Sequence, residues 1–244
     1  MLLSGCALGS GDKEVVKECI LPQDQAGTLT ARWKVTAVPI ALQQGAFSAE
    51  ETQAIVAAAD TWNTFYASSL GMAAIDYGDP ANPRTSTAAR PANLCAGGIL
   101  TGTEFKGSIV IYKYKTWPYP EAADVIAFTK TCKSAGNPLP FFFMAVMELN
   151  YQKFFSAGRK APDLQSIVLH ELGHVMGLDH SCEKSPGDKV VPNCTSAGMN
   201  QEYATASMYP VFGFDAYGLG EQKRTLNRND QGRANCLYQD AVAQ

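Results

Sequence analysis

The sequence is poor in histidine and has no long apolar run. Only three of its 244 residues are histidine, and no apolar run approaches the roughly 20 residues that a membrane-spanning helix needs. It also lacks an excess of charge of one sign, since the formal net charge at pH 7 is −3. A nucleic-acid partner requires a basic face to neutralise phosphates. The charge balance therefore argues against such a partner, and nothing in it indicates a membrane surface.

The chain has enough apolar residues to build a core. Hydrophobic residues make up 46% of it and charged residues 18%, which excludes a disordered tail and a small scaffold held together only by disulfides. The length allows one or two domains, and no low-complexity stretch or internal repeat requires the higher number. We expect one domain over residues 31–244, acting as a monomer.

The N-terminus points to a cellular compartment. Residues 2–6 read Leu-Leu-Ser-Gly-Cys, which is similar to the site where bacterial lipoproteins are cleaved and lipidated, with Cys6 as the lipidated residue. The alternative is a chance pattern, because only residues 1–5 precede Cys6, whereas a signal peptide has a basic start and an apolar run. We interpret residues 1–5 as the remnant of a truncated signal and the polar residues 6–30 as a tether. The expected location is the bacterial cell envelope, with the lipid-anchored protein facing the periplasm or the exterior.

The seven cysteines fit the same compartment. With Cys6 reserved for a lipid, six cysteines remain, an even number suited to three disulfides under oxidising conditions. Six cysteines can pair in many ways, so the sequence leaves the connectivity open.

The residue pattern predicts an α+β fold with a twisted mixed sheet of about five strands. Ser48 and Glu51 form a capping box that begins one helix, and Gly71 ends it after an apolar stripe that packs on the sheet. A second helix is expected over residues 163–176, and a third closes the chain over residues 227–238. Segments rich in β-branched and aromatic residues predict strands at 33–41, 72–77, 108–114, 124–129 and 141–149.

All three histidines fall within residues 170–180, at the spacing of a metal site. His170 and His174 are one helical turn apart, so both imidazoles leave the same face of the helix. Gly177 can adopt a positive φ, end the helix and turn the chain, which lets His180 supply a third nitrogen. A lone histidine is more often an ordinary core or surface residue. Three neutral ligands with one open position, however, are the arrangement of a catalytic zinc.

Glu171 follows the first of these histidines and projects close to the predicted metal. A carboxylate there can act as a general base by taking a proton from zinc-bound water. Zinc lowers the pKa of that water from about 15.7 toward 7 and polarises a scissile carbonyl group. The reaction that best fits these residues is hydrolysis of a peptide bond.

Residues 170–180 read His-Glu-x-x-His-x-x-Gly-x-x-His, which matches in full the extended motif of the metzincin zinc endopeptidases. The chain therefore resembles this group. The run Ser-Met-Tyr-Pro at residues 207–210 is similar to the turn below the metal in the matrixin branch. There Met208 would form a hydrophobic floor without being a ligand. The likeness extends over residues 32–238.

The resemblance also implies where a substrate lies. In matrixins an edge strand pairs with an extended peptide by β-augmentation, and the matching strand here is residues 124–130. The residues after the methionine form the wall of the pocket for the side chain just beyond the cleaved bond, where we expect an apolar residue. The expected substrate-binding residues are Ile126, Ala127, Phe128, Tyr209, Pro210 and Val211.

Two features depart from the matrixin pattern near the metal. Residues 181–206 form an unusually long insertion that contains Cys182 and Cys194. These cysteines could form a local disulfide, contributing about 3 kcal/mol by closing the loop, or bind a metal, although their spacing matches no zinc knuckle. No histidine remains for the structural zinc that matrixins often carry, so we expect one zinc ion.

Two further features concern latency and calcium. Residues 19–24 resemble the propeptide segment whose cysteine keeps matrixins inactive, but cysteine parity favours a disulfide for Cys19, with Cys236 as partner if the ends of the domain meet. Calcium could bind to carboxylates in the loops, although exposed carboxylates without an ion are the simpler interpretation. The candidate calcium ligands are Asp76, Asp79 and Asp124.

The sequence as a whole predicts a zinc metalloendopeptidase that acts on proteins or peptides. The alternative is a surface-binding lipoprotein that keeps the metzincin fold but is catalytically silent, or that cleaves only itself or one partner. A binding scaffold has no need of Glu171, so the complete set of ligands and base favours the enzyme.

Overall fold

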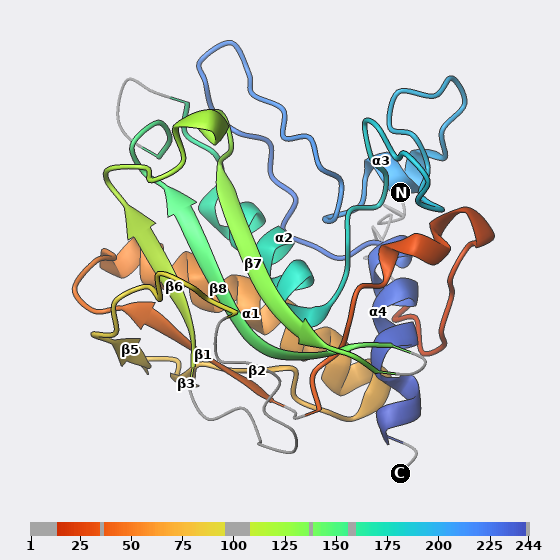
Figure 1. Ribbon diagram of the computed structural model, residues 1–244, viewed down its shortest axis with the longest axis horizontal. Helices are drawn as coiled ribbons and strands as arrows, with labels where there is room; N and C mark the ends of the chain where they lie inside the picture. The colour runs from red at the N-terminus through yellow and green to blue at the C-terminus, as the bar shows by residue number, and fades with distance from the viewer. Residues whose placement is uncertain (1–13, 35–36, 96–107, 137–138, 156–159, 243–244) are drawn as a thin grey trace, which may run out of the picture.

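The computed structural model describes residues 14–34, 37–95, 108–136, 139–155 and 160–242 (Figure 1). Six strands form one mixed sheet: five follow in the order β2-β1-β6-β8-β7, and β5 pairs with β1. Helices α1 and α2 lie behind the sheet in the view of Figure 1, and α4 stands beside it. The predicted α+β fold with about five strands is therefore confirmed. The strands of the sheet are β1 (Val38–Gln43), β2 (Ile75–Asp76), β5 (Thr85–Ser86), β6 (Ile109–Tyr114), β7 (Ala127–Ser134) and β8 (Phe141–Asn150).

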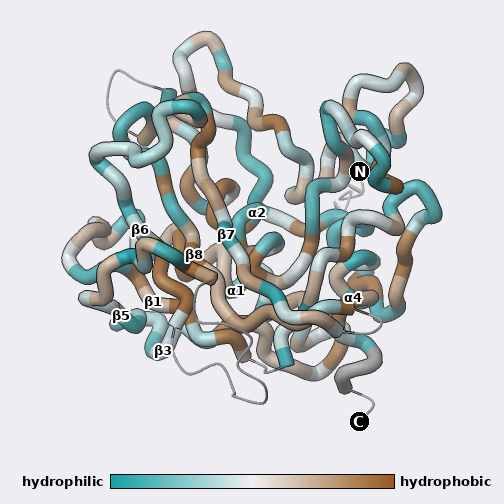
Figure 2. The backbone as a smooth tube through the Cα atoms, viewed as in Figure 1, coloured by the Kyte–Doolittle hydropathy of each residue, from teal (hydrophilic) through white to brown (hydrophobic). Residues whose placement is uncertain are grey.

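The strand order leaves β7 at the edge of the sheet. β1, β6 and β8 run parallel, and β7 runs antiparallel to β8. Along β6, Ile109 and Ile111 join the main core, whereas Val110 and Tyr112 pack with Val146 in a second cluster, as the alternation of a strand requires. Hydrophobic colouring follows β1 and β8 in Figure 2. Within the described residues no strand pairs with the outer edge of β7, so its backbone groups are open to an added strand.

Helix α1 forms as the sequence predicts. Ser48 and Glu51 make the reciprocal capping box, and Gly71 ends the helix with a φ of 68°. The helix packs on α2, where Trp62 Nε1 donates a hydrogen bond to the Leu169 carbonyl at 2.9 Å. No helix in the described part is long and apolar enough to cross a membrane. The helices are α1 (Ala49–Leu70), α2 (Leu164–Met176), α3 (Gln201–Ala204) and α4 (Arg228–Val242), with 3₁₀ turns η1 (Gln23–Thr28) and η2 (Pro120–Ala122).

The first strand begins later than its sequence suggests. The prediction of residues 33–41 is wrong at its start, because β1 begins at Val38. Trp33 instead anchors the preceding segment to α2: its side chain is buried, and its Nε1 donates to the Val175 carbonyl at 2.7 Å. Trp33 therefore marks a buried anchor and not the start of the strand.

Two other strands have shifted bounds. The segment 72–77 contributes only the two residues of β2, because the Asn63 side chain accepts the amides just before and at its start, at 3.1 and 2.8 Å. A short hairpin of β3 (Gly78–Asp79) and β4 (Asn82–Pro83) follows. The strand predicted at 124–129 lies further along the chain as β7, because a turn in which Val125 N donates to the Ala122 carbonyl precedes it.

Six cysteines form three disulfides. Their pairing agrees with the prediction from parity and with the two pairs that the sequence favoured. In this structure Cys19 is therefore not free to act as a latency switch, and Cys182 and Cys194 are not metal ligands. The disulfides are Cys19–Cys236, Cys95–Cys132 and Cys182–Cys194.

The N-terminal segment, residues 15–30, packs against the domain, although the sequence predicts a tether there. Gln25 and Thr28 are fully buried, and the amide of Val16 donates to the side chain of Gln231 on α4 at 2.9 Å. The sequence pattern misses this packing because the buried side chains are polar and have partners far away in the chain.

Residues 1–13 lie outside the described part of the chain. They include Cys6 and the predicted signal remnant. Lipid anchoring therefore stays a prediction, which the mass of the mature N-terminal peptide would test.

Candidate metal centre and active site

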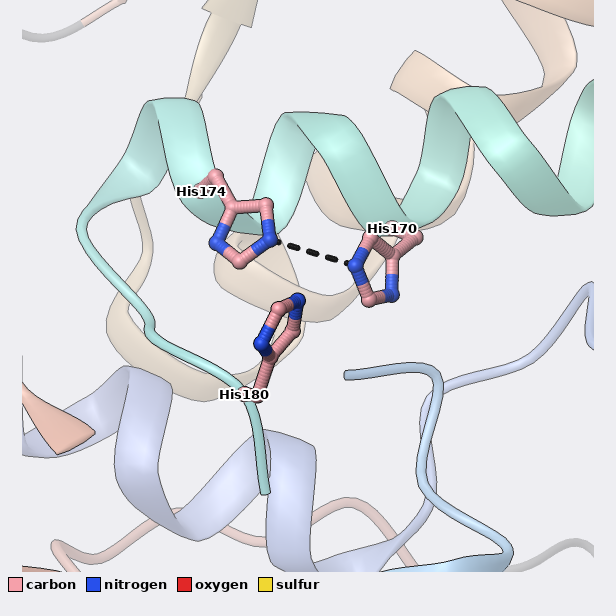
Figure 3. Close-up of side chains that lie close together, drawn as sticks. All are labelled: His170, His174 and His180. Atoms are coloured by element: carbon pink, nitrogen blue, oxygen red, sulfur yellow. Dashed lines mark hydrogen bonds between the residues drawn. The ribbon is translucent and has the colours of Figure 1, made fainter. Parts of the chain in front are cut away.

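Helix α2 positions two of the three histidines. The Asp163 carboxylate caps its start by accepting from Ser166 N at 3.0 Å, and Gly177 ends it with a φ of 108°, as predicted. His170 and His174 face each other on one side of the helix, with their Nε2 atoms 3.1 Å apart (Figure 3). The helix therefore places the two side chains on one face, as their spacing of one turn predicts.

The other ring nitrogens of these two histidines contact backbone carbonyls. His170 Nδ1 lies 2.7 Å from the Ser207 carbonyl oxygen, and His174 Nδ1 lies 2.8 Å from that of Leu178. Such contacts fix the orientation of an imidazole and its tautomer, leaving Nε2 as the metal-binding atom. Both helical histidines are therefore oriented as ligands.

His180 completes the group from outside the helix. The turn at Gly177 returns the chain, so the His180 ring faces the other two (Figure 3). One ligand atom from each histidine lies within 4.8 Å of the others. The Nδ1 atom of His180 is 3.6 Å from a carboxylate oxygen of Glu183. The structure therefore brings together all three residues that the sequence predicts as metal ligands.

The electrostatics of the three histidines suit a cation. Burial, and then the neighbouring His174, lower the pKa of His170 well below its usual value and that of His180 to about 3. At neutral pH both imidazoles are thus neutral, the form that binds a metal. Three imidazoles with no thiolate fit a catalytic zinc better than a structural one.

Glu171 is a buried acidic residue at this centre. It is 6% exposed, and its Oε2 atom has no hydrogen-bond partner among the described residues. Burial raises the pKa of its carboxyl group, while His174 and Thr129 act in the opposite direction. Thr129 Oγ1, on β7, donates to the Glu171 backbone carbonyl at 3.2 Å. A buried carboxylate oxygen without a partner is costly unless a ligand or water uses it.

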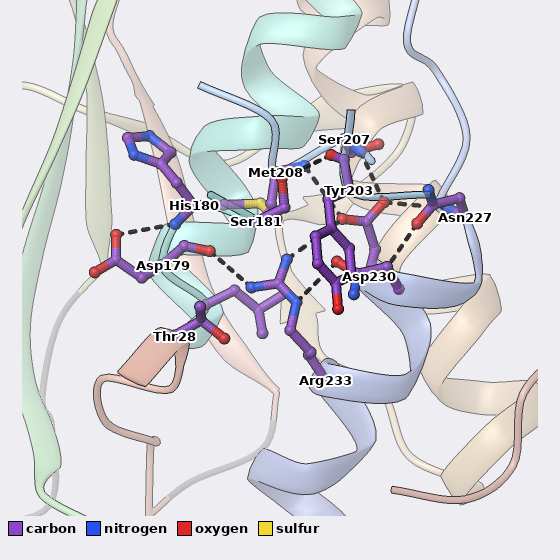
Figure 4. Close-up of polar contacts among 12 residues, drawn as sticks. Thr28, Asp179, His180, Ser181, Tyr203, Ser207, Met208, Asn227, Asp230 and Arg233 are labelled. Carbon is purple, nitrogen blue, oxygen red and sulfur yellow. Dashed lines mark hydrogen bonds and ion pairs between the residues drawn. The ribbon is translucent and has the colours of Figure 1, made fainter. Parts of the chain in front are cut away.

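Met208 lies under the helix that carries the histidines. Its side chain is fully buried and sits directly against Gly173, where any added Cβ would collide with the sulfur. The amides of Ser207 and Met208 donate to the two oxygens of the Asp230 carboxylate at 2.7 and 3.1 Å (Figure 4). The position predicted for Met208 as a hydrophobic floor is consistent with this packing.

Asp230 and Arg233, both on α4, were not identified as part of the site from the sequence. Burial raises the pKa of the Asp230 carboxyl, although Arg233 opposes this change. Burial also lowers the pKa of Arg233 to about 10, so it stays protonated at neutral pH. A charged pair within the last predicted helix was the available signal, but nothing local indicates that it binds the backbone next to Met208 and His180.

A cleft of ≈ 930 Å³ runs past the histidines between β7 and the segment after Met208. Of the predicted substrate-binding residues, Tyr209 is not among those lining this cleft, and its ring instead lies 4.7 Å from Lys223 Nζ. Phe212 and Phe214 line the cleft and were missed, because the resemblance to matrixins indicates a pocket wall only as far as residue 211. The predicted residues that do line the cleft are Ile126, Ala127, Phe128, Pro210 and Val211.

The candidate calcium ligands do not converge. Within the described residues, the groups of three that could hold a metal are the histidine trio and the set Asp179, His180 and Glu183. Asp76 is instead paired with Arg84 at 2.7 Å, and Asp124 with Lys153. The structure gives no support to a calcium site at the predicted aspartates.

Comparison with known families gives one match. The family model described as matrixin matches residues 42–192. This range includes α1, β7, the whole of α2 and His180, and it ends before Met208. No curated protein matches the chain.

Proposed function

We propose that the chain, which belongs to the matrixin family of metzincin-type zinc peptidases, is a zinc-dependent endopeptidase. Its general base would be Glu171. One observation carries this proposal. Glu171, whose buried Oε2 atom has no partner among the described residues, lines the same cleft as the three imidazoles. A scaffold that only binds a partner has no use for such a carboxylate.

The three histidines, His170, His174 and His180, would hold the zinc ion. When bound, zinc would act as a Lewis acid that makes a water molecule more acidic and stabilises negative charge developing on the substrate carbonyl. The remaining work falls to the chain's own side chains and backbone.

Glu171 would move the proton. Its carboxylate takes a proton from the attacking water and later delivers it to the nitrogen of the leaving amine. The raised pKa that burial gives this carboxyl suits both steps, because a group whose pKa lies nearer to the operating pH accepts a proton more strongly and can still return it.

The outer edge of β7 would bind the substrate backbone. Within the described residues this edge has no strand partner, so an extended peptide can add to the sheet by hydrogen bonds to its main chain. Ala127 and Phe128 are the first residues of β7 and line the cleft. The substrate would then pass between this strand and the opposite wall formed by Pro210, Val211 and Phe212.

Replacing Glu171 by alanine tests the proposal. We expect Glu171→Ala to keep its zinc and to lose hydrolysis of casein by about 10²–10⁴-fold, the usual contribution of a general base. Chelation should abolish the activity of the unchanged protein, and added zinc should restore it. Glu121→Gln, at an exposed position that does not line the cleft, is the matched control and should cleave like the unchanged protein.

The results separate the alternatives. If Glu171→Ala cleaved casein as fast as the unchanged protein, the proposed role of Glu171 would be wrong. If the unchanged protein bound zinc but cleaved no casein at any protein concentration, the chain would be a binding module or a protease restricted to itself or one partner.

A further inference from the structure

The segment that carries the third histidine is held through its backbone. Asp179, His180 and Ser181 lie beyond the end of α2 and belong to no helix or strand of the sheet. The amide of Ser181 donates to the Met208 carbonyl at 2.8 Å. The carbonyls on either side of His180 are bound by two side chains, one from each end of the chain.

Arg233 of α4 binds the first of these carbonyls. Its Nη1 donates to the Asp179 carbonyl at 3.0 Å (Figure 4). Its Nε donates to Asn229 Oδ1 at 3.1 Å. Its side chain is 0% exposed. The nearest acid, Asp230, is 3.8 Å from Nη2, which has no hydrogen-bond partner among the described residues. Burying a guanidinium is costly, and its best-made hydrogen bonds here go to the Asp179 carbonyl and to Asn229.

Gln25 of the N-terminal segment binds the second carbonyl. Its Nε2 donates to the Ser181 carbonyl at 2.7 Å, and its Oε1 accepts from Asn229 Nδ2 at 2.5 Å. In the same segment, the Thr28 carbonyl accepts from the Asp179 amide at 2.7 Å. Asn229 thus joins Gln25 to Arg233, and the three buried side chains form one network around the backbone of the third histidine.

We propose that Gln25 and Arg233, joined through Asn229, are positioning residues for His180 and thereby raise the affinity of the site for zinc. The inference rests on the proposed function only in taking His180 as a zinc ligand. Fixing both flanking carbonyls places the His180 ring opposite the two helical imidazoles before metal arrives, so that less ordering has to accompany zinc binding.

A general role in stabilising α4 does not explain why a buried arginine stands at position 233. The same helix contributes Ala234, Leu237 and Tyr238 to the apolar core, and an apolar side chain in place of Arg233 would fill the space without burying a charge. The specific property of Arg233 and Gln25 is that each donates a hydrogen bond to a carbonyl next to His180.

Asn235 offers a matched control on the same helix. It is also fully buried, and its Nδ2 donates to the carbonyls of Val16 and Glu18 in the N-terminal segment at 2.9 and 3.1 Å. It therefore ties the same two parts of the chain together but makes no contact with the His180 segment that the structure records. If Arg233 served only to stabilise the fold, changing Asn235 and changing Arg233 would have equal effects on zinc affinity.

The experiment measures zinc affinity on the full chain with intact disulfides. Arg233→Met, Gln25→Met, Asn235→Leu and His180→Ala are compared with the unchanged protein by competition with a chromophoric chelator at pH 7. Near-ultraviolet circular dichroism verifies folding, and urea titration of the metal-free proteins gives stability. We expect Arg233→Met and Gln25→Met each to weaken zinc binding about tenfold or more, the usual effect of losing a group that orients a ligand. Asn235→Leu should lose stability but keep its zinc affinity within about twofold.

The outcomes are distinct. If the folded Arg233→Met and Gln25→Met proteins bind zinc as tightly as the unchanged protein, or if Asn235→Leu weakens binding as much as they do, the inference is overturned. Should Arg233→Met fail to fold, Gln25→Met decides alone. If His180→Ala binds zinc like the unchanged protein, or the unchanged protein binds none, it is the proposed function that fails.

Discussion

His170 and His174 reach the metal centre by a different route from His180. The first two are placed by the regular geometry of α2, one turn apart, and their rings are oriented by carbonyls of nearby turns. His180 lies on an irregular segment whose position depends on residues from both ends of the chain. The candidate metal centre thus depends both on the local geometry of a helix and on contacts between residues far apart in the sequence.

This difference separates what short motifs encode from what tertiary structure must supply. A helix fixes the relation between residues four apart by its own hydrogen bonds. A segment without regular structure needs partners for its exposed backbone groups, and distant buried side chains can provide them. We therefore expect changes in the chain to affect the two parts of the centre unequally, except where one residue serves both.

Met208 is such a shared residue, and the largest effect is expected there. Its side chain lies against Gly173 of α2, and its carbonyl accepts from Ser181 N at 2.8 Å. Met208→Ala should lower the free energy of unfolding by about 2–5 kcal/mol, as removal of a buried methionine side chain usually does. Urea unfolding of the metal-free protein measures this loss. Met208→Leu, which nearly conserves volume, should cost less than about 1.5 kcal/mol, and equal losses for both variants would contradict the packing role.

The Cys182–Cys194 disulfide lies next to the irregular segment that carries His180 and not on α2. Replacing both cysteines by serine should lower the free energy of unfolding by up to about 3 kcal/mol, since the cross-link restricts the unfolded chain. Hydrogen exchange should become faster at the amides of Glu183 and Cys194, which donate to the carbonyls of Pro192 and Glu183. The amides of α2 should remain protected, and an equal loss of protection there would show that the two parts are not independent.

The Asp163 cap lies at the start of α2, the helix that carries His170 and His174. The smallest change in the free energy of unfolding is expected there. Partial burial raises the pKa of Asp163, but hydrogen bonds from Arg224 and Ser166 lower it more, so its pKa lies below the usual value. Because the folded pKa is depressed, the stabilisation by this carboxylate is complete above its unfolded pKa of about 3.9 and is lost as pH falls through the folded pKa.

Asp163→Asn should therefore cost about 0.2–1 kcal/mol near neutral pH, because asparagine still caps the helix but loses the ion pair with Arg224. Urea titrations at several pH values should find that the difference from the unchanged protein shrinks as the pH falls below about 4. Asp188→Asn, in an exposed loop, serves as control. A difference that stayed constant down to the lowest pH would contradict a depressed pKa for Asp163 in the folded protein.

The same division explains which features could be predicted from the sequence. The capping box of α1, the cap at Asp163, the stop at Gly177 and the helical pair of histidines are local patterns, and all of them are present in the structure. The position of His180 could also be predicted, because Gly177, whose turn brings the chain back toward the helical histidines, is only three residues away.

The features that were missed depend on contacts between distant residues. Nothing near Gln25 in the sequence indicates that its amide is buried beside Ser181, more than 150 residues away. Arg233 is likewise an ordinary cation in the sequence of an amphipathic helix. The reduced strand β2 has the same cause, because the side chain of Asn63 on α1 takes the amides that a longer strand would have used.

The position of the N-terminal segment has a consequence for biosynthesis. Cys19 and Gln25 are among the first described residues to leave the ribosome, but their partners, Cys236 and Asn229, are among the last. The support around His180 therefore cannot form before α4 has been synthesised. A nascent or truncated chain that lacks α4 would hold the helical pair of histidines without a properly held third one, so the order of synthesis itself delays completion of the proposed zinc site until α4 has been made.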